Sequence, residues 1–100
     1  MSEGRATQRL DLWLYQARFF KTRAMAARLL KAGKVRVGGE RTDKPHRGVG
    51  EGDVLTFPQG ARVRVVRVVG LGERRGPASE AQTLYEDIGE ERDARSAGAP

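Results

Sequence analysis

The spacing of the hydrophobic residues changes from a helical period to an alternating one near residue 34, and this change constrains the fold more than any other feature. Upstream of it, two segments repeat apolar residues at intervals of three and four, which is typical of amphipathic helices. Thr7 and Thr22 are expected as their N-caps, and Gly33 as the left-handed residue that ends the second helix. The buried face of the first helix is predicted to hold Leu10, Trp13, Leu14 and Ala17.

The second predicted helix divides into an apolar arc and a basic arc. The apolar arc is expected to face the core and consists of Met25, Ala26, Leu29 and Leu30. The opposite arc consists of Arg23, Ala24, Ala27, Arg28 and Lys31. An ordinary exposed face mixes charges of both signs, whereas this one has no acidic residue. We therefore interpret it as a binding face for a negatively charged backbone, which the small alanines allow to approach closely.

The alternating part of the chain predicts short strands joined by tight turns. Gly38-Gly39 lies between two short alternating segments and suits a two-residue hairpin turn, because glycine tolerates positive φ at both positions. The expected strands are residues 35–37, 40–42, 54–57 and 62–69, with a loop at 43–53.

Alternation slips within the last of these strands, where Val65 and Val66 are adjacent. A β-bulge at this point would place Arg62, Arg64 and Arg67 on one face and turn the valines inward.

The residues after Gly76 return to a helical period. Pro77 suits the first turn of a helix, where its missing N–H costs nothing. The apolar face of this helix is predicted to cover valines of the preceding strand, and it consists of Ala81, Leu84, Tyr85 and Ile88.

These elements predict an α+β fold in which two N-terminal helices pack on a small, mostly antiparallel sheet, with a C-terminal helix appended. A chain of 100 residues suits a single domain. We expect the main domain over residues 9–70, a linker and the C-terminal helix over 71–88, and flexible termini at 1–8 and 89–100.

Positive charge is concentrated in the middle of the chain. Residues 18–47 hold 10 basic and 2 acidic side chains, although the whole chain carries only +6. Such a density repels itself unless an anionic partner neutralises it, which favours a nucleic acid. The apolar stretches are short, so we expect no membrane association and a cytoplasmic location.

Little in the sequence supports catalysis. The chain has no cysteine and one histidine, which excludes thiol nucleophiles, disulfides and multi-histidine metal sites. His46 stands alone in a basic loop, and no second group completes a nucleophile–base pair. We therefore predict a non-enzymatic protein with no catalytic residue, metal or cofactor.

Two helices with a basic second member also fit a helix-turn-helix DNA-binding regulator. The first turn of the second helix, however, offers only one base-reading side chain, Arg23. The basic set continues beyond the helix through Lys34, Arg36, Arg41, Lys44 and Arg47, which favours recognition of folded RNA by shape. A third alternative is the accessory domain of an RNA-modifying enzyme such as a pseudouridine synthase, for which the residues after 75 are too few to form a catalytic domain.

Several blocks, in this order, resemble a known family. They are Arg9-Leu10-Asp11, Trp13-Leu14, residues 17–23, residues 33–37, Lys44-Pro45, Val49 and Gly52-Asp53. Over residues 9–70 the chain resembles the S-four RNA-binding domain, named after a small-subunit ribosomal protein. The continuation through residues 74–78, Glu80-Ala81 and residues 84–87 is similar to the ribosome-associated heat-shock protein fifteen family.

The resemblance implies a function and a site. Members of that family are small proteins that bind large ribosomal subunits and act when translation stalls with a nascent chain attached. It implies ribosomal RNA and the large subunit as partners, with tRNA as a further candidate, and we expect a monomer. It implies RNA contacts from Arg18, Lys21, Thr22, Arg23, Arg28, Lys31, Lys34, Arg36 and Lys44, to which the charge pattern adds Arg47.

Overall fold

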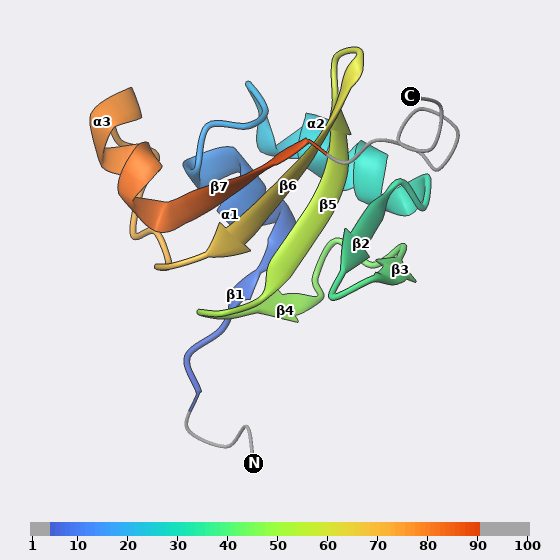
Figure 1. Ribbon diagram of the computed structural model, residues 1–100, viewed down its shortest axis with the longest axis horizontal. Helices are drawn as coiled ribbons and strands as arrows, with labels where there is room; N and C mark the ends of the chain where they lie inside the picture. Colours follow the sequence, from blue (N-terminus) through green and yellow to red (C-terminus); the bar gives the residue numbers. More distant parts are fainter. Residues whose placement is uncertain (1–4, 91–100) are drawn as a thin grey trace.

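A computed structural model describes residues 5–90, which form an α+β fold. The helices are α1 (Leu10–Gln16), α2 (Arg23–Lys31) and α3 (Ala78–Ala81), the last followed by a 3-10 turn at Gln82–Leu84. The strands are β1 (Gln8–Arg9), β2 (Val35–Val37), β3 (Glu40–Thr42), β4 (Gly48–Val49), β5 (Val54–Gln59), β6 (Arg62–Val68) and β7 (Tyr85–Glu90). Five of them form one sheet in the order β3-β2-β5-β6-β7, and every pairing among the described strands is antiparallel. Helices α1 and α2 lie behind this sheet (Figure 1). The predicted fold class is confirmed.

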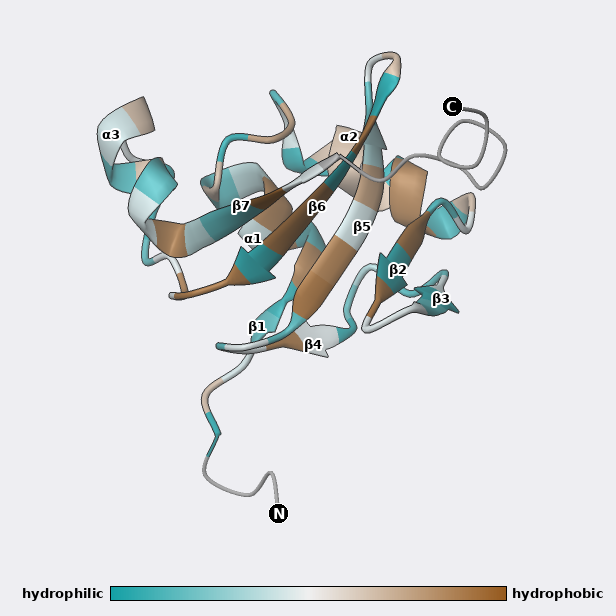
Figure 2. Cartoon of the chain, in the orientation of Figure 1, coloured by the Kyte–Doolittle hydropathy of each residue, from teal (hydrophilic) through white to brown (hydrophobic). Residues whose placement is uncertain are grey.

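The core lies between these two helices and one face of the sheet. Hydrophobic residues are concentrated along β2, β5 and β6 (Figure 2). Trp13 is fully buried, and its indole Nε1 donates a hydrogen bond to the carbonyl oxygen of Gly70 at 2.8 Å. The Phe19 ring packs edge-on against Phe57, with 4.9 Å between the ring centroids. The predicted buried face of α1 is confirmed, since Leu10, Trp13, Leu14 and Ala17 are all buried.

Both ends of α2 follow the local sequence. The Thr22 hydroxyl accepts a hydrogen bond from the N–H of Met25 at 3.1 Å, as an N-cap should. Gly33 adopts a φ of 72°, and its N–H donates to the Leu30 carbonyl while that of Lys34 donates to Leu29. This pair of bonds is a Schellman motif, so the predicted helix end is confirmed.

Two expectations about the helices are wrong. Met25 is 42% exposed, because the short helix buries only a narrow stripe containing Ala26 and Leu30. Thr7 does not cap α1, which begins at Leu10 with Arg9 in the cap position and no side-chain cap. The first two N–H groups of α1 instead donate to backbone carbonyls of the 45–47 loop.

The glycine hairpin is confirmed. Gly38 and Gly39 have φ values of 60° and 90°, and β2 and β3 pair across them over the predicted residues. The predicted loop at 43–53 also contains β4, which pairs with β1. A two-residue strand has no periodicity of its own, so this pairing left no signal in the sequence.

The β-bulge lies in a different strand from the one expected. Strand β6 pairs continuously with β5, and the register shifts only where β6 meets β7. Val65 pairs with Gly89 and Val66 with Asp87, so the extra residue is Ile88 of β7. The β6 arginines therefore do not share one face, because Arg64 points inward with Val66 while Arg67 points outward. The guanidinium carbon of Arg64 stacks 5.3 Å from the centre of the Phe19 ring.

The C-terminal helix is shorter than predicted. It ends at Ala81, and Tyr85–Glu90 pairs as a strand along β6 instead of continuing as a helix over 85–88. Leu84 and Tyr85 pack against the core, whereas Ile88 is 46% exposed. The free edge of the valine-rich β6 needs a backbone partner, and this demand overrides the local helical spacing. Of the termini predicted to be flexible, residues 1–4 and 91–100 lie outside the described residues. The prediction is wrong for Gln8, which pairs with Val49 as part of β1, and for residues 89–90, which belong to β7.

Candidate nucleic-acid interface

The exposed face of α2 carries the predicted basic arc. Arg23, Ala24, Arg28 and Lys31 are exposed, and Ala27 is half-buried. No acidic residue occurs in α2, so its outer surface is uniformly positive or apolar. Because Ala24 and Ala27 have short side chains, the longer arginine and lysine side chains project beyond them, and a phosphate backbone could approach the helix closely.

Asp11 organises the N-terminal end of this face. Its carboxylate is only 4% exposed and accepts two bonds from the Arg9 guanidinium, each 3.1 Å long, and one from the Leu12 N–H at 2.7 Å. Arg23 Nε lies 3.4 Å from the same carboxylate. Asp11 thus holds two half-exposed guanidinium groups side by side at the start of α2. The sequence reasoning missed Arg9 as a site residue, although it stands in the first block that resembles the family.

The 43–47 loop is held against the N-terminus of α1. The N–H groups of Leu10 and Asp11 donate to the carbonyls of Arg47 at 2.8 Å and Pro45 at 3.1 Å. These bonds place Lys44 and Arg47 near Asp11 and the two guanidinium groups that it holds. Lys44 is exposed, and its Nζ lies 3.8 Å from Oδ1 of Asp43. Arg47 is half-buried, and its guanidinium donates a hydrogen bond to the Gly48 carbonyl at 3.2 Å.

The connection between α1 and α2 is held by the linker that precedes α3. Arg18 adopts a φ of 68°, and its guanidinium donates to the Gly76 carbonyl at 3.1 Å. Arg75 donates to the Tyr15 carbonyl at 3.2 Å and stacks on the Tyr15 ring. Arg18 is therefore engaged within the fold, whereas Lys21 and Thr22 are exposed at the tip of the connection.

Lys34 and Arg36 lie beyond the C-terminal end of α2. Both are exposed, and together with Arg41 they line a cavity next to β2. Helix α2 consequently runs between two basic groups. The first lies around Asp11 and consists of Arg9, Arg23, Lys44 and Arg47, and the second lies at β2 and consists of Lys34, Arg36 and Arg41. The structure brings the predicted residues together in this arrangement, with Arg18 set apart by its bond to the linker.

Alternative kinds of site find little support in residues 5–90. Within that range no three histidine, cysteine or acidic side chains are grouped to hold a metal ion, and no helix is long and apolar enough to cross a membrane. His46 is exposed in the 45–47 loop.

Comparison with known proteins places the chain among characterised relatives. The family model of the S4 domain matches residues 8–55. Heat shock protein 15 of Escherichia coli (strain K12) is 48% identical over 82 residues, which cover 82% of this chain and 61% of the relative. A heat shock protein 15 homolog from Aeromonas salmonicida is 44% identical over 79 residues, covering 79% of this chain and 59% of that protein. The chain thus spans about three-fifths of the length of these relatives.

A solved structure agrees over almost the whole fold. Heat shock protein 15 from Vibrio cholerae, described as trimeric, superposes with a TM-score of 0.78 at 35% sequence identity. The superposition covers 94% of this chain and 89% of that one. Because sequence and fold agree over nearly the full length of a solved homologue, the chain belongs to the heat shock protein 15 family and contains an S4 domain.

Proposed function

We propose that this protein binds structured RNA through α2 and the two basic groups at its ends, without catalysing a reaction. The acid-free basic face of α2 is the observation that carries the proposal. The binding residues are those predicted from the sequence, joined by Arg9 and Arg41. Family membership supports RNA as the ligand, because this basic surface lies largely within the S4 domain.

The distribution of charge favours RNA over duplex DNA. A helix-turn-helix protein inserts the start of its second helix into the major groove. Here that start offers Arg23, which Asp11 holds beside Arg9, followed by Ala24 and Met25. The remaining charge is spread over a loop, a hairpin and a helix, which suits the irregular shape of folded RNA.

A competition assay tests this preference. We expect structured RNA to stay bound when duplex DNA of the same length is added at equal nucleotide concentration. The bound fraction would be measured by the fluorescence anisotropy of labelled RNA. Displacement of the RNA by the DNA would favour the helix-turn-helix alternative.

The proposed target is ribosomal RNA of the large ribosomal subunit. The expected role is action on stalled ribosomes under stress, with tRNA as a further candidate ligand and the cytoplasm as the location. In a cell lysate fractionated on a sucrose gradient, we expect the protein to sediment with the large subunit. Recovery only in the top fractions, under conditions that keep ribosomes intact, would contradict this target.

The oligomeric state is a separate prediction. From the sequence we expect a monomer, whereas the Vibrio cholerae relative is described as a trimer. Light scattering coupled to size-exclusion chromatography would decide between a mass near 11.0 kDa and a multiple of it.

A further inference from the structure

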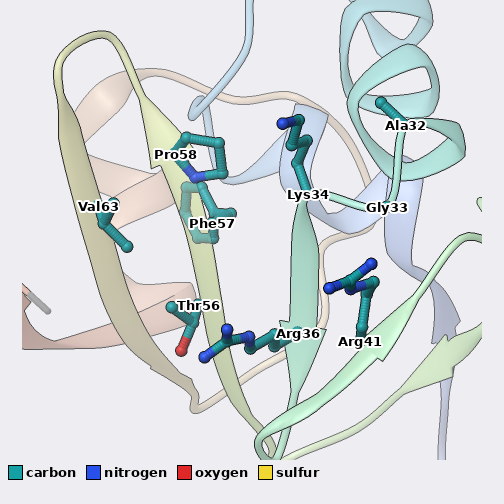
Figure 3. Close-up of a pocket in the computed structure, with 9 residues that line it drawn as sticks. All are labelled: Ala32, Gly33, Lys34, Arg36, Arg41, Thr56, Phe57, Pro58 and Val63. Atoms are coloured by element: carbon teal, nitrogen blue, oxygen red, sulfur yellow. The ribbon is translucent and has the colours of Figure 1, made fainter. Parts of the chain in front are cut away.

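A cavity of about 390 Å³ lies just beyond the C-terminal end of α2, between β2 and the β5–β6 hairpin. Ligand sites range over roughly 300–1,000 Å³, so this one has room for a single small group. It is lined by Ala32, Gly33, Lys34, Arg36, Arg41, Thr56, Phe57, Pro58 and Val63 (Figure 3).

One side of the cavity is strongly cationic. Lys34, Arg36 and Arg41 come from the β2–β3 side, and none of the nine lining residues is acidic (Figure 3). Arg36 and Arg41 are direct cross-strand partners. Lysine and arginine side chains donate charge-assisted hydrogen bonds to phosphate oxygens. The geometry therefore suits a phosphate group.

The opposite side of the cavity is apolar. Pro58 and Val63 are cross-strand partners on the half-exposed outer face of the sheet, and Thr56 lies next to them on the same face. Figure 3 shows Pro58 and Val63 across the cavity from the cationic side chains. A planar, weakly polar ring could lie against this wall.

Because Gly33 has no side chain, the Arg41 side chain can pack close to the backbone at this position. A Cβ atom at position 33 would lie 3.3 Å from Cδ of Arg41, closer than most such contacts. Gly33 also has a positive φ, which disfavours any other residue. The helix-ending glycine thus serves a second purpose by admitting Arg41 to the rim of the cavity.

We propose that this cavity binds one unstacked nucleotide of RNA, with its phosphate at the cationic side and its base against Pro58 and Val63. The inference rests on the proposed RNA binding and adds to it a preference for a single-stranded segment next to the structured RNA that α2 is proposed to contact. Single-stranded nucleotides expose their base faces, and proteins recognise them by combining phosphate contacts with packing against the base.

The test compares an RNA hairpin with the same hairpin carrying a short single-stranded extension. We expect the extension to strengthen binding by about tenfold, which corresponds to about 1.4 kcal/mol, because one base packs against the apolar wall. Val63→Ser should remove most of this gain while leaving the affinity for the plain hairpin within about twofold, because Val63 lines the cavity and is not one of the RNA-binding residues proposed above. Arg41→Gln should also remove the gain, but it should weaken binding of the plain hairpin as well. Arg67→Gln is the matched control, because Arg67 lies on the same outer face but is paired with Glu86 and does not line the cavity.

The outcomes separate this inference from the proposed function. A plain hairpin that binds while the extension adds nothing would overturn the nucleotide site and leave RNA binding by α2 intact. A gain that survives in both Arg41→Gln and Val63→Ser would also overturn it. Failure of every RNA to bind would instead refute the proposed function. Thermal unfolding of each variant verifies that it remains folded.

Discussion

Replacing Arg23, Arg28 and Lys31 together by glutamine should weaken binding to structured RNA by roughly two to three orders of magnitude at 0.1 M salt. Each phosphate contact contributes about 0.9 to the slope of log affinity against log salt, so three lost contacts lower the slope by about 2.7. The loss should shrink as the salt concentration rises, because screening removes the same interactions. Titrations of labelled RNA at several salt concentrations would measure both the affinity and the slope.

A matched triple variant separates local contact from overall charge. Arg5, Arg67 and Arg74 lie away from the α2 face, and each forms an exposed or half-exposed ion pair, with Asp53, Glu86 and Glu80. Their replacement by glutamine removes the same charge and costs little stability, since such pairs contribute little. If this variant weakens RNA binding as much as the α2 variant does, net charge and not the α2 face determines affinity.

Trp13→Ala should destabilise the fold by about 3–5 kcal/mol, the usual range for truncating a buried tryptophan. Trp13 is fully buried and bonded to Gly70, so the variant loses both packing and a hydrogen bond. The free energy of unfolding of a domain of this size is only about 5–15 kcal/mol, so Tm should fall by more than about 10 °C. Since Trp13 is the only tryptophan, unfolding would be followed by far-UV circular dichroism and not by indole fluorescence.

Trp13→Phe divides this effect into its parts. The phenyl ring retains much of the buried surface but cannot donate to Gly70, and the lost bond should cost about 1–3 kcal/mol. An unchanged Tm in Trp13→Ala would show that the side chain does not anchor the core.

The elements that the sequence predicted best are those fixed by nearby residues. Thr22 caps α2, Gly33 ends it, and Gly38-Gly39 closes the hairpin. Each depends on a backbone conformation or hydrogen bond within a few residues, so the local sequence is sufficient to specify it.

The segment from Tyr85 to Glu90 shows where local reasoning fails. Its apolar spacing fits a helix, but the residues pair with β6 as a strand. The deciding interaction comes from a strand about twenty residues earlier, and periodicity in one segment cannot report a partner elsewhere. The bulge was misplaced for the same reason, because it depends on how β7 aligns with β6.

The candidate site divides in the same way. The basic arc of α2 follows from residue type and helical period alone, and its exposure is confirmed. The grouping of Arg9 with Arg23 around Asp11 and of Arg41 with Arg36 depends on tertiary contacts and strand register. Charge counting found the basic surface but not its division into two groups.

The residues after β6 also determine how short a stably folded fragment of this protein can be. The S4 domain match ends at residue 55, yet Trp13 bonds to Gly70, Gln8 to Gly72 and Arg18 to Gly76. A fragment cut at the family boundary would keep the basic helix and lose the carbonyls that anchor the segments before it. The segment that matches the family model is therefore shorter than the segment that completes the fold, because β7 also pairs with β6, and Leu84 and Tyr85 pack against the core. Transferring the proposed RNA-binding surface into another protein would require the chain through residue 90.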